Sequence, residues 1–206
     1  ISFPENAHED RIQFEQNSFW VKHRLSVLLN VLKNFPPKGT LFDLGGGNGF
    51  ISSKFTENHY HSILVEPTLE GARNGYIRGV KPVIKGAFND DLFLNNSLPS
   101  VGLFDVLEHI EKDIKFLKLV RKKLISEGRI YITVPAYRFL WSKKDEYAGH
   151  YRRYTLKELY WKIKKAGFKI EYSTYFFSFL TPMIFLMRTL PDKFGLTSSS
   201  NRKFQK

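Results

Sequence analysis

The stretch Phe42-Asp43-Leu44-Gly45-Gly46-Gly47-Asn48-Gly49 joins an apolar segment to a segment of helical character. Residues 40–44 predict a short buried strand, and residues 48–57 predict a helix. Glycines at a strand-to-helix turn let the chain bend tightly and bring bare backbone against a ligand. The stretch therefore predicts a nucleotide-like ligand at the carboxyl edge of a sheet.

Two acidic residues narrow the choice of ligand. A Walker loop is excluded, because no Lys-Ser/Thr pair follows the glycines, and the dinucleotide fingerprint fits poorly, because Phe50 stands at its last glycine. Asp43 is a poor neighbour for a pyrophosphate but suits a ligand that carries an ammonium and a sulfonium. Glu66 ends a second predicted strand, 62–66, where it can accept both ribose hydroxyl hydrogen bonds. Together the acids favour S-adenosylmethionine over NAD.

Strands and helices alternate along the rest of the chain. Further strands are predicted at residues 80–84, 98–103, 130–134 and 168–174, and helices at 17–34, 68–78, 113–124 and 155–167, with Asn17 or Ser18, Asp113 and the Thr155/Glu158 pair as caps. This alternation predicts an α/β fold with a single doubly wound, mostly parallel sheet and helices on both faces. We expect one domain over 1–206, with an N-terminal cap region (1–36), a core (37–174), and an apolar segment and polar tail (175–206).

Three later motifs add a resemblance. They are Phe104-Asp105-Val106-Leu107-Glu108-His109, the apolar run 128–135, and Gly149-His150-Tyr151-Arg152-Arg153-Tyr154-Thr155. With the glycine loop, they make residues 40–168 resemble the class I S-adenosylmethionine-dependent methyltransferases of small molecules, which have a Rossmann-like fold. Residues 136–155 look like a subgroup linked to surface polysaccharide, glycan or lipid metabolism.

The resemblance implies a set of cofactor residues. These are Trp20, Asp43, Gly45, Gly46, Gly47, Glu66, Pro67, Phe88, Leu103 and Phe104. Leu103 and Phe104 would border the methionine part and Phe88 the adenine. Trp20 would cover the cofactor from the N-terminal helix, although a role in the core is an equal alternative. The chain departs from the family at Ala87, where an Asp often contacts adenine.

Two histidines are the candidate catalytic residues. Methyl transfer from a sulfonium requires mainly an aligned nucleophile, and a hydroxyl acceptor also needs a base. We expect His109 or His150 to be that base, supported by Asp105, Glu108 and Tyr154, although single histidines more often have structural roles. Asp105, Glu108 and His109 also resemble a divalent-metal cluster of some related methyltransferases, which His150 would complete; a metal-free site is our first interpretation.

The predicted loop 135–154 and the residues after it are the candidate substrate-binding region. Its candidate residues are Tyr137, Trp141, Arg152, Arg153 and Tyr154. The adjacent arginines suit an anionic group on the substrate. An equal alternative is that they attach the loop to the domain through ion pairs.

The distribution of charged and apolar residues along the chain gives expectations about binding partners. Residues 111–170 hold 17 Lys/Arg against 6 Asp/Glu, a face that attracts anions unless it is simply a solvated surface. The apolar segment 175–190 is interrupted by Pro182 and Arg188, so we expect it to pack over the site, to rest on a membrane surface, or to dimerise, in that order. The chain has no cysteine, which suits a cytoplasmic protein, including one bound peripherally at the inner membrane face.

The leading hypothesis is methyl transfer to a hydroxyl or amine of a small molecule or lipid-linked intermediate. The alternatives are a non-catalytic S-adenosylmethionine-binding subunit and an RNA methyltransferase. The chain shows no appended RNA-binding module and no Asn-Pro-Pro-Tyr motif. We expect no DNA partner, and the oligomeric state is left open.

Overall fold

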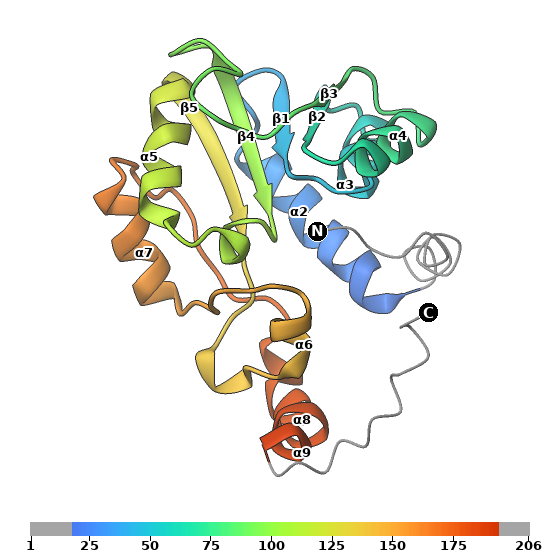
Figure 1. Cartoon of the computed structure of the whole chain (residues 1–206), viewed down its shortest axis with the longest axis vertical. Helices are drawn as coiled ribbons and strands as arrows, with labels where there is room; N and C mark the ends of the chain where they lie inside the picture. The colour runs from blue at the N-terminus through green and yellow to red at the C-terminus, as the bar shows by residue number, and fades with distance from the viewer. Residues whose placement is uncertain (1–17, 194–206) are drawn as a thin grey trace.

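A computed structural model describes residues 18–193 and has a five-stranded sheet at its centre (Figure 1). All strand pairs are parallel, in the order β3-β2-β1-β4-β5. The strands are β1 (Leu41–Leu44), β2 (Ser62–Glu66), β3 (Val83–Lys85), β4 (Leu98–Phe104) and β5 (Leu124–Thr133). The order reverses between β1 and β4, which is where parallel α/β sheets open a crevice for ligands. The predicted fold class is confirmed.

Helices link the strands and cover the sheet. The longer ones are α2 (Phe19–Asn34), α3 (Phe50–Glu57), α4 (Leu69–Ile77), α5 (Asp113–Lys123) and α7 (Leu156–Lys165). Helix α7 begins with the predicted capping box, in which Thr155 Oγ1 accepts from the Glu158 N–H at 3.2 Å and Glu158 accepts from the Thr155 N–H at 3.0 Å. Both hydrogen bonds of the predicted capping box are therefore present.

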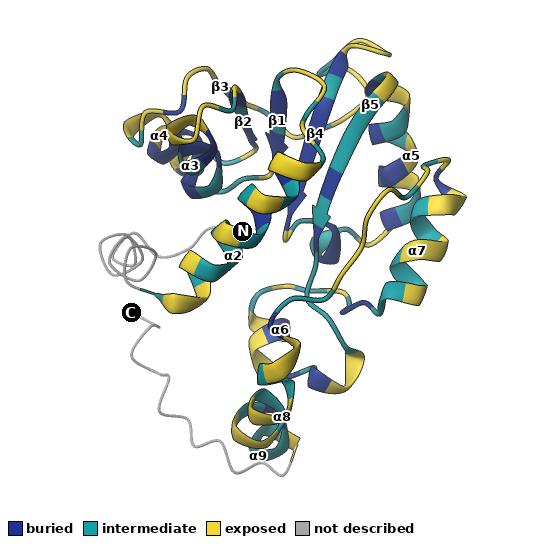
Figure 2. Ribbon diagram, turned by 180° about the vertical axis from the view of Figure 1, so that it is seen from behind, coloured by how far each residue is buried: buried dark blue, intermediate teal, exposed yellow. Residues whose placement is uncertain are grey.

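Two apolar clusters form the core, one on each face of the sheet. Helix α2 contributes Leu28 and Leu32 to the first cluster, which contains Phe55 and Phe104. Helix α5 contributes to the second, which extends over β4 and reaches α7. Figure 2 shows the buried residues following the strands and the inner sides of these helices. The sheet thus holds the carboxyl ends of β1, β2 and β4 in fixed relative positions.

The predicted strand at 168–174 is wrong. This segment is irregular, and no strand in the part of the chain that the structure describes pairs with the outer edge of β5. The segment faces β5 and α2 across a groove of about 460 Å³ and is attached by an Arg129–Glu171 ion pair and by stacking of Tyr172 on Phe35. Its alternating apolar residues suit a strand, but strand formation also needs a neighbour within bonding distance.

Other boundaries also differ. Strand β5 begins at Leu124, six residues before the predicted strand. Asp113 does not cap α5, since the N-cap is Lys112, and Ser18 makes no side-chain capping bond. The predicted cap Asn17 and the polar tail after Lys193 lie outside the described residues.

The region predicted as a loop holds local helix. It contains the 3-10 helix η3 (Arg138–Leu140) and α6 (Lys143–Tyr147). The apolar segment after Phe177 forms η4 (Ser178–Leu180), α8 (Thr181–Ile184), a π-helical stretch η5 (Phe185–Thr189) and α9 (Leu190–Lys193). Among the described residues, no helix combines the length and apolarity needed to cross a membrane.

Candidate functional site

The glycine loop follows β1 directly and leads into α3. Gly45, Gly47 and Gly49 have φ values of 70°, 59° and 73°, in the left-handed region that favours glycine. Gly46 is needed for a different reason, because a Cβ there would lie 2.4 Å from Asp43 Oδ2. The loop therefore has a left-handed glycine at every second position, and its backbone at Gly46 packs against the Asp43 side chain.

Asp43 lies within β1, fully buried beneath the loop. Its Oδ2 accepts a 2.6 Å hydrogen bond from the Ser52 hydroxyl, whereas Oδ1 has no partner within the described part of the chain. Burial, with a smaller contribution from the charge of Glu66, raises the pKa of Asp43 to about 6. An unpaired buried carboxylate oxygen is costly and marks a place where a positively charged or hydrogen-bond-donating ligand would be stabilised.

Glu66 ends β2 and is held by backbone donors. One carboxylate oxygen, Oε2, accepts from the Gly47 N–H at 3.0 Å, and Oε1 accepts from the Thr68 N–H at 3.0 Å and the Thr68 hydroxyl at 2.6 Å. The adjacent Gly71 has no room for a side chain, since a Cβ would lie 2.8 Å from the Gly47 oxygen. Glu66 is thus oriented at the loop, and three of its roughly four acceptor positions are filled, which leaves one on Oε2 for a hydroxyl donor.

The remaining predicted cofactor residues occupy mixed environments. Pro67 is exposed beside Glu66, and Phe88 is half-buried with its ring against Phe116 at 5.7 Å between centroids. Leu103 and Phe104 are buried in the two apolar clusters of the core.

Trp20 lies near the N-terminal end of α2, away from the sheet core. Its ring stacks on Phe177 at 3.7 Å, and 41% of the residue is exposed. One turn later, Arg24 forms a 2.6 Å ion pair with Asp105, at the end of β4. The sequence did not predict this pair, although Asp105 stands in one of the motifs quoted above, because the contact depends on how α2 crosses the sheet.

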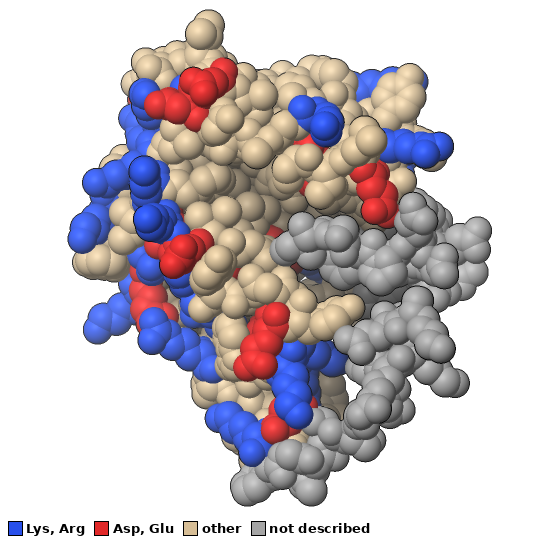
Figure 3. All heavy atoms as spheres, in the orientation of Figure 1, with Lys and Arg blue, Asp and Glu red and all other residues tan. Residues whose placement is uncertain are grey.

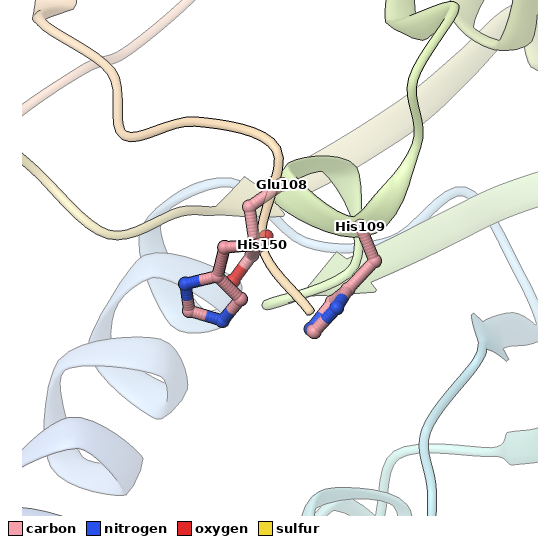
Figure 4. Close-up of side chains that lie close together, drawn as sticks. All are labelled: Glu108, His109 and His150. Carbon is pink, nitrogen blue, oxygen red and sulfur yellow. The ribbon is translucent and has the colours of Figure 1, made fainter. Parts of the chain in front are cut away.

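The two candidate catalytic histidines lie together. His109 belongs to the 3-10 helix η2 (Leu107–His109), just after β4, and His150 follows α6; their rings are 4.7 Å apart in an edge-to-face arrangement. Burial, followed by the charge of His150, lowers the pKa of His109. Burial, followed by the charge of Asp105, raises the pKa of the neighbouring Glu108 to about 8. Figure 4 shows Glu108 and both rings pointing toward one another.

Asp145, from α6, organises the segment around His150. Its carboxylate bonds His150 Nδ1 at 3.0 Å and Arg153 at 2.8 and 3.1 Å, and also contacts Arg188. Burial alone would raise the pKa of Asp145, but hydrogen bonds from His150 and Arg153 outweigh it and hold the pKa well below its usual value. The carboxylate therefore remains charged and fixes the ring orientation of His150.

The candidate substrate residues are mostly engaged within the protein. Arg152 binds Asp113, and Arg153 binds Asp145, as expected if these arginines attach the loop to the domain. Tyr154 is 2% exposed and donates to Asp113. Tyr137 stacks on Tyr175 at 4.8 Å, and the Trp141 indole donates to Glu146.

Basic residues gather on the side of the molecule that carries α5 and α7, as Figure 3 shows. On α7, Lys164 and Lys165 lie over the exposed rings of Tyr160 and Trp161 at 4.7 and 4.6 Å. These lysines shield aromatic surface in solvent. Such contacts fit the interpretation of a solvated helix face.

The fold was compared with those of known proteins. A search of curated protein sequences found no similar protein. The structure resembles a Thermotoga maritima protein described as an S-adenosylmethionine-dependent methyltransferase and possible histamine N-methyltransferase, at TM-score 0.60 and 22% identity over 81% of this chain and 80% of that one. It also resembles an Archaeoglobus fulgidus S-adenosylmethionine-dependent methyltransferase, at TM-score 0.56 and 20% identity over 77% and 74% of the two chains.

A third similar structure holds a cofactor product. It is a Haemonchus contortus phosphoethanolamine N-methyltransferase in complex with phosphomonomethylethanolamine and S-adenosylhomocysteine, at TM-score 0.52 and 20% identity over 68% of this chain and 36% of that one. These identities support a shared fold. The model of the methyltransferase domain family matches residues 14–173, which is most of the chain. The chain therefore belongs to the methyltransferase domain family.

Proposed function

We propose that the protein binds S-adenosylmethionine on the glycine loop and transfers its methyl group to a hydroxyl or amine of a small molecule. The observation that carries the proposal is the pair of buried acids at neighbouring strand ends, Asp43 with one unpaired oxygen and Glu66 oriented by the loop backbone. In this arrangement Glu66 accepts a hydrogen bond from a ribose hydroxyl at its remaining acceptor position. The uncharged loop provides backbone N–H groups without a counter-charge for phosphates.

The chemical step needs little from the protein besides alignment. The acceptor lone pair forms the new bond to the methyl carbon as the carbon–sulfur bond breaks, and that bond's electrons stay on sulfur as a neutral thioether. For a hydroxyl acceptor, the proton passes to a base or to solvent. His109 and His150 lie beside the carboxyl edge of β4 and are the nearby rings for this role.

The first test is cofactor binding by isothermal titration calorimetry. We expect S-adenosylmethionine and S-adenosylhomocysteine to bind and NAD not to bind. In Glu66→Gln we expect affinity to fall about tenfold, since charge-assisted hydrogen bonds are worth about 1.5–3 kcal/mol. The matched control is Glu57→Gln, on the exposed end of α3, where Glu57 pairs with Lys54. Preferential NAD binding would refute the proposal.

For the acceptor class, we propose a lipid-linked or otherwise amphiphilic molecule. The segment from η4 to η5 exposes Phe179, Met183, Leu186 and Met187. Met183 and Met187 line a groove of about 430 Å³ together with Trp20 and the basic residues Lys144 and Arg188. An apolar face of this kind suits an acyl or prenyl chain or an interfacial contact.

Sedimentation with phosphatidylglycerol vesicles tests this acceptor class. We expect the protein to co-sediment, and the double variant Leu186→Ser/Met187→Ser to lose most of the binding. As a control, Leu94→Ser removes another exposed apolar side chain, remote in the sequence from this segment. Equal sedimentation of all three proteins would exclude the apolar segment as the contact.

A further inference from the structure

Three potential metal ligands converge beside the glycine loop. Glu108 and His109 come from η2, immediately after β4, and His150 comes from the segment after α6. Each offers one ligand atom, and these atoms lie within 4.8 Å of one another. Figure 4 shows the three side chains turned toward a common point from two separate segments of the chain.

Two of these residues each have a buried polar atom without a hydrogen-bond partner in the described part of the chain. The atoms are Glu108 Oε2 and His109 Nδ1, and Glu108 is only 1% exposed. A buried carboxylate oxygen and a buried imidazole nitrogen each lose free energy when nothing replaces their bonds to water. Both atoms accept a cation or a donor, so their joint lack of a partner points to a ligand at this position.

His150 is already oriented as a ligand. Its Nδ1 is bound to Asp145 Oδ1 at 3.0 Å, which leaves Nε2 for another partner. Asp145 is itself 1% exposed and is held by two bonds from Arg153. Metal-binding histidines characteristically bond a carboxylate through the second ring nitrogen, which fixes the ring.

The nearby arginines are paired with carboxylates. Arg24 pairs with Asp105 at 2.6 Å, and Arg153 and Arg188 share Asp145 at 2.8 and 3.3 Å. Asp105, which is paired with Arg24 and bonded by the Thr133 hydroxyl, is not among the three clustered residues. The cluster therefore differs from the four-residue set that the sequence motif suggests.

We propose that Glu108, His109 and His150 bind one divalent transition-metal ion. Two imidazoles and one carboxylate are a ligand set for zinc and neighbouring metals, whereas magnesium and calcium prefer oxygen ligands. Three protein ligands leave at least one coordination position open, as in catalytic metal sites.

The position of the cluster gives the metal a role in the proposed methyl transfer, and this role rests on that function. The η2 residues follow Val106, whose side chain packs against Gly45. A Cβ added at Gly45 would lie 3.2 Å from Val106 Cγ2. The open position thus belongs to the same edge of the sheet as the cofactor loop. A hydroxyl bound there loses its proton more readily, which favours a hydroxyl acceptor over an amine.

Cobalt titration of the untagged protein tests the site directly, with visible absorption as the readout. We expect about one Co²⁺ per chain, displaced by Zn²⁺. Glu108→Gln and His109→Ala each remove a ligand, and we expect each to weaken binding at least about tenfold, since even outer-shell changes cost 10–100-fold. His61→Ala, which removes an exposed imidazole paired with Thr40, is the matched control and should bind as the wild type does.

Circular dichroism melts establish that each variant is folded, and His109→Asn provides a second, polar replacement. Absence of cobalt binding in the wild type, or binding unaffected by changes at both Glu108 and His109, would overturn the metal site. S-adenosylmethionine is titrated into the same samples. Cofactor binding without metal binding refutes the metal site alone, and metal binding without cofactor binding refutes the proposed function alone.

Discussion

At the scale of single residues, buried carboxylates connect distant parts of the chain. Asp113 Oδ2 accepts from Lys162 at 2.6 Å, Arg152 at 2.7 Å and the Tyr154 hydroxyl at 3.0 Å. The sequence pattern predicted Asp113 to be a helix cap, because periodicity reports local structure and does not identify partners 39 to 49 residues away. The same holds for Asp145, whose ion pairs decide what Arg153 does.

Asp113→Asn should lower the free energy of unfolding by about 2 kcal/mol, because it leaves two cations without their buried counter-charge. Although burial opposes it, bonds from Lys162 and Arg152 lower the pKa of Asp113 from 3.8. The stabilisation of the fold by ionised Asp113 is therefore present above pH 3.8 and is lost as pH falls through the lower, folded-state pKa. Urea unfolding at neutral and acidic pH measures this, with exposed Asp91→Asn as control; an unchanged difference across that range would contradict it.

Gly46→Ala should reduce cofactor binding and lower stability by about 1–3 kcal/mol, because overpacking forces neighbours to shift. The new Cβ would lie 2.4 Å from Asp43 Oδ2 and 2.6 Å from Leu64 Cδ1. Gly79→Ala controls for backbone strain, since Gly79 has φ of +87° with open space around it. Calorimetry with S-adenosylhomocysteine should show a loss in Gly46→Ala only; wild-type affinity there would count against the loop as the binding site.

At the scale of elements, periodicity and capping predicted most of the helices and strands. Two of the failures concern strands. Residues 168–174 alternate like a strand but lie across a groove from β5, and β5 starts early because pairing with Leu98 recruits Leu124. Both outcomes depend on which backbone comes within hydrogen-bonding distance, which local sequence does not encode.

The capping box of α7 yields a prediction for this element. Thr155→Ala removes the hydroxyl that accepts from the Glu158 N–H and should cost about 1 kcal/mol of stability. Thr174→Ala, at an exposed threonine outside any helix or strand, should be near neutral. Chemical unfolding of both variants gives the comparison, and equal effects would mean that the box adds no stability.

At the scale of the whole molecule, the site is assembled from segments that meet only in the fold. Asp43 and Glu66 could be predicted as neighbours, because parallel strands end at one edge. The contact of α2 with Asp105 could not, since it depends on how α2 crosses that edge. The proximity of His150 to Glu108 was expected only from the resemblance to a metal cluster of related methyltransferases, because local sequence does not specify how the segment around α6 folds back.

Trp20 and Phe177 link α2 to the apolar C-terminal segment by stacked rings 3.7 Å apart. A double-mutant cycle with Trp20→Ala and Phe177→Ala should give a coupling of about 0.5–1.5 kcal/mol. Additive losses in thermal unfolding would show that the two segments are energetically independent. His23 and Leu94 are not in contact in the described structure and provide the control. The stability losses of His23→Ala and Leu94→Ala should be additive.

A crystal structure with S-adenosylhomocysteine tests most directly whether the glycine loop holds the cofactor. We predict the ribose hydroxyls against Glu66 and the rest of the molecule across Gly45–Gly47, within reach of Asp43 Oδ1. Ligand density in the groove between β5 and residues 167–174, with the glycine loop empty, would contradict the account.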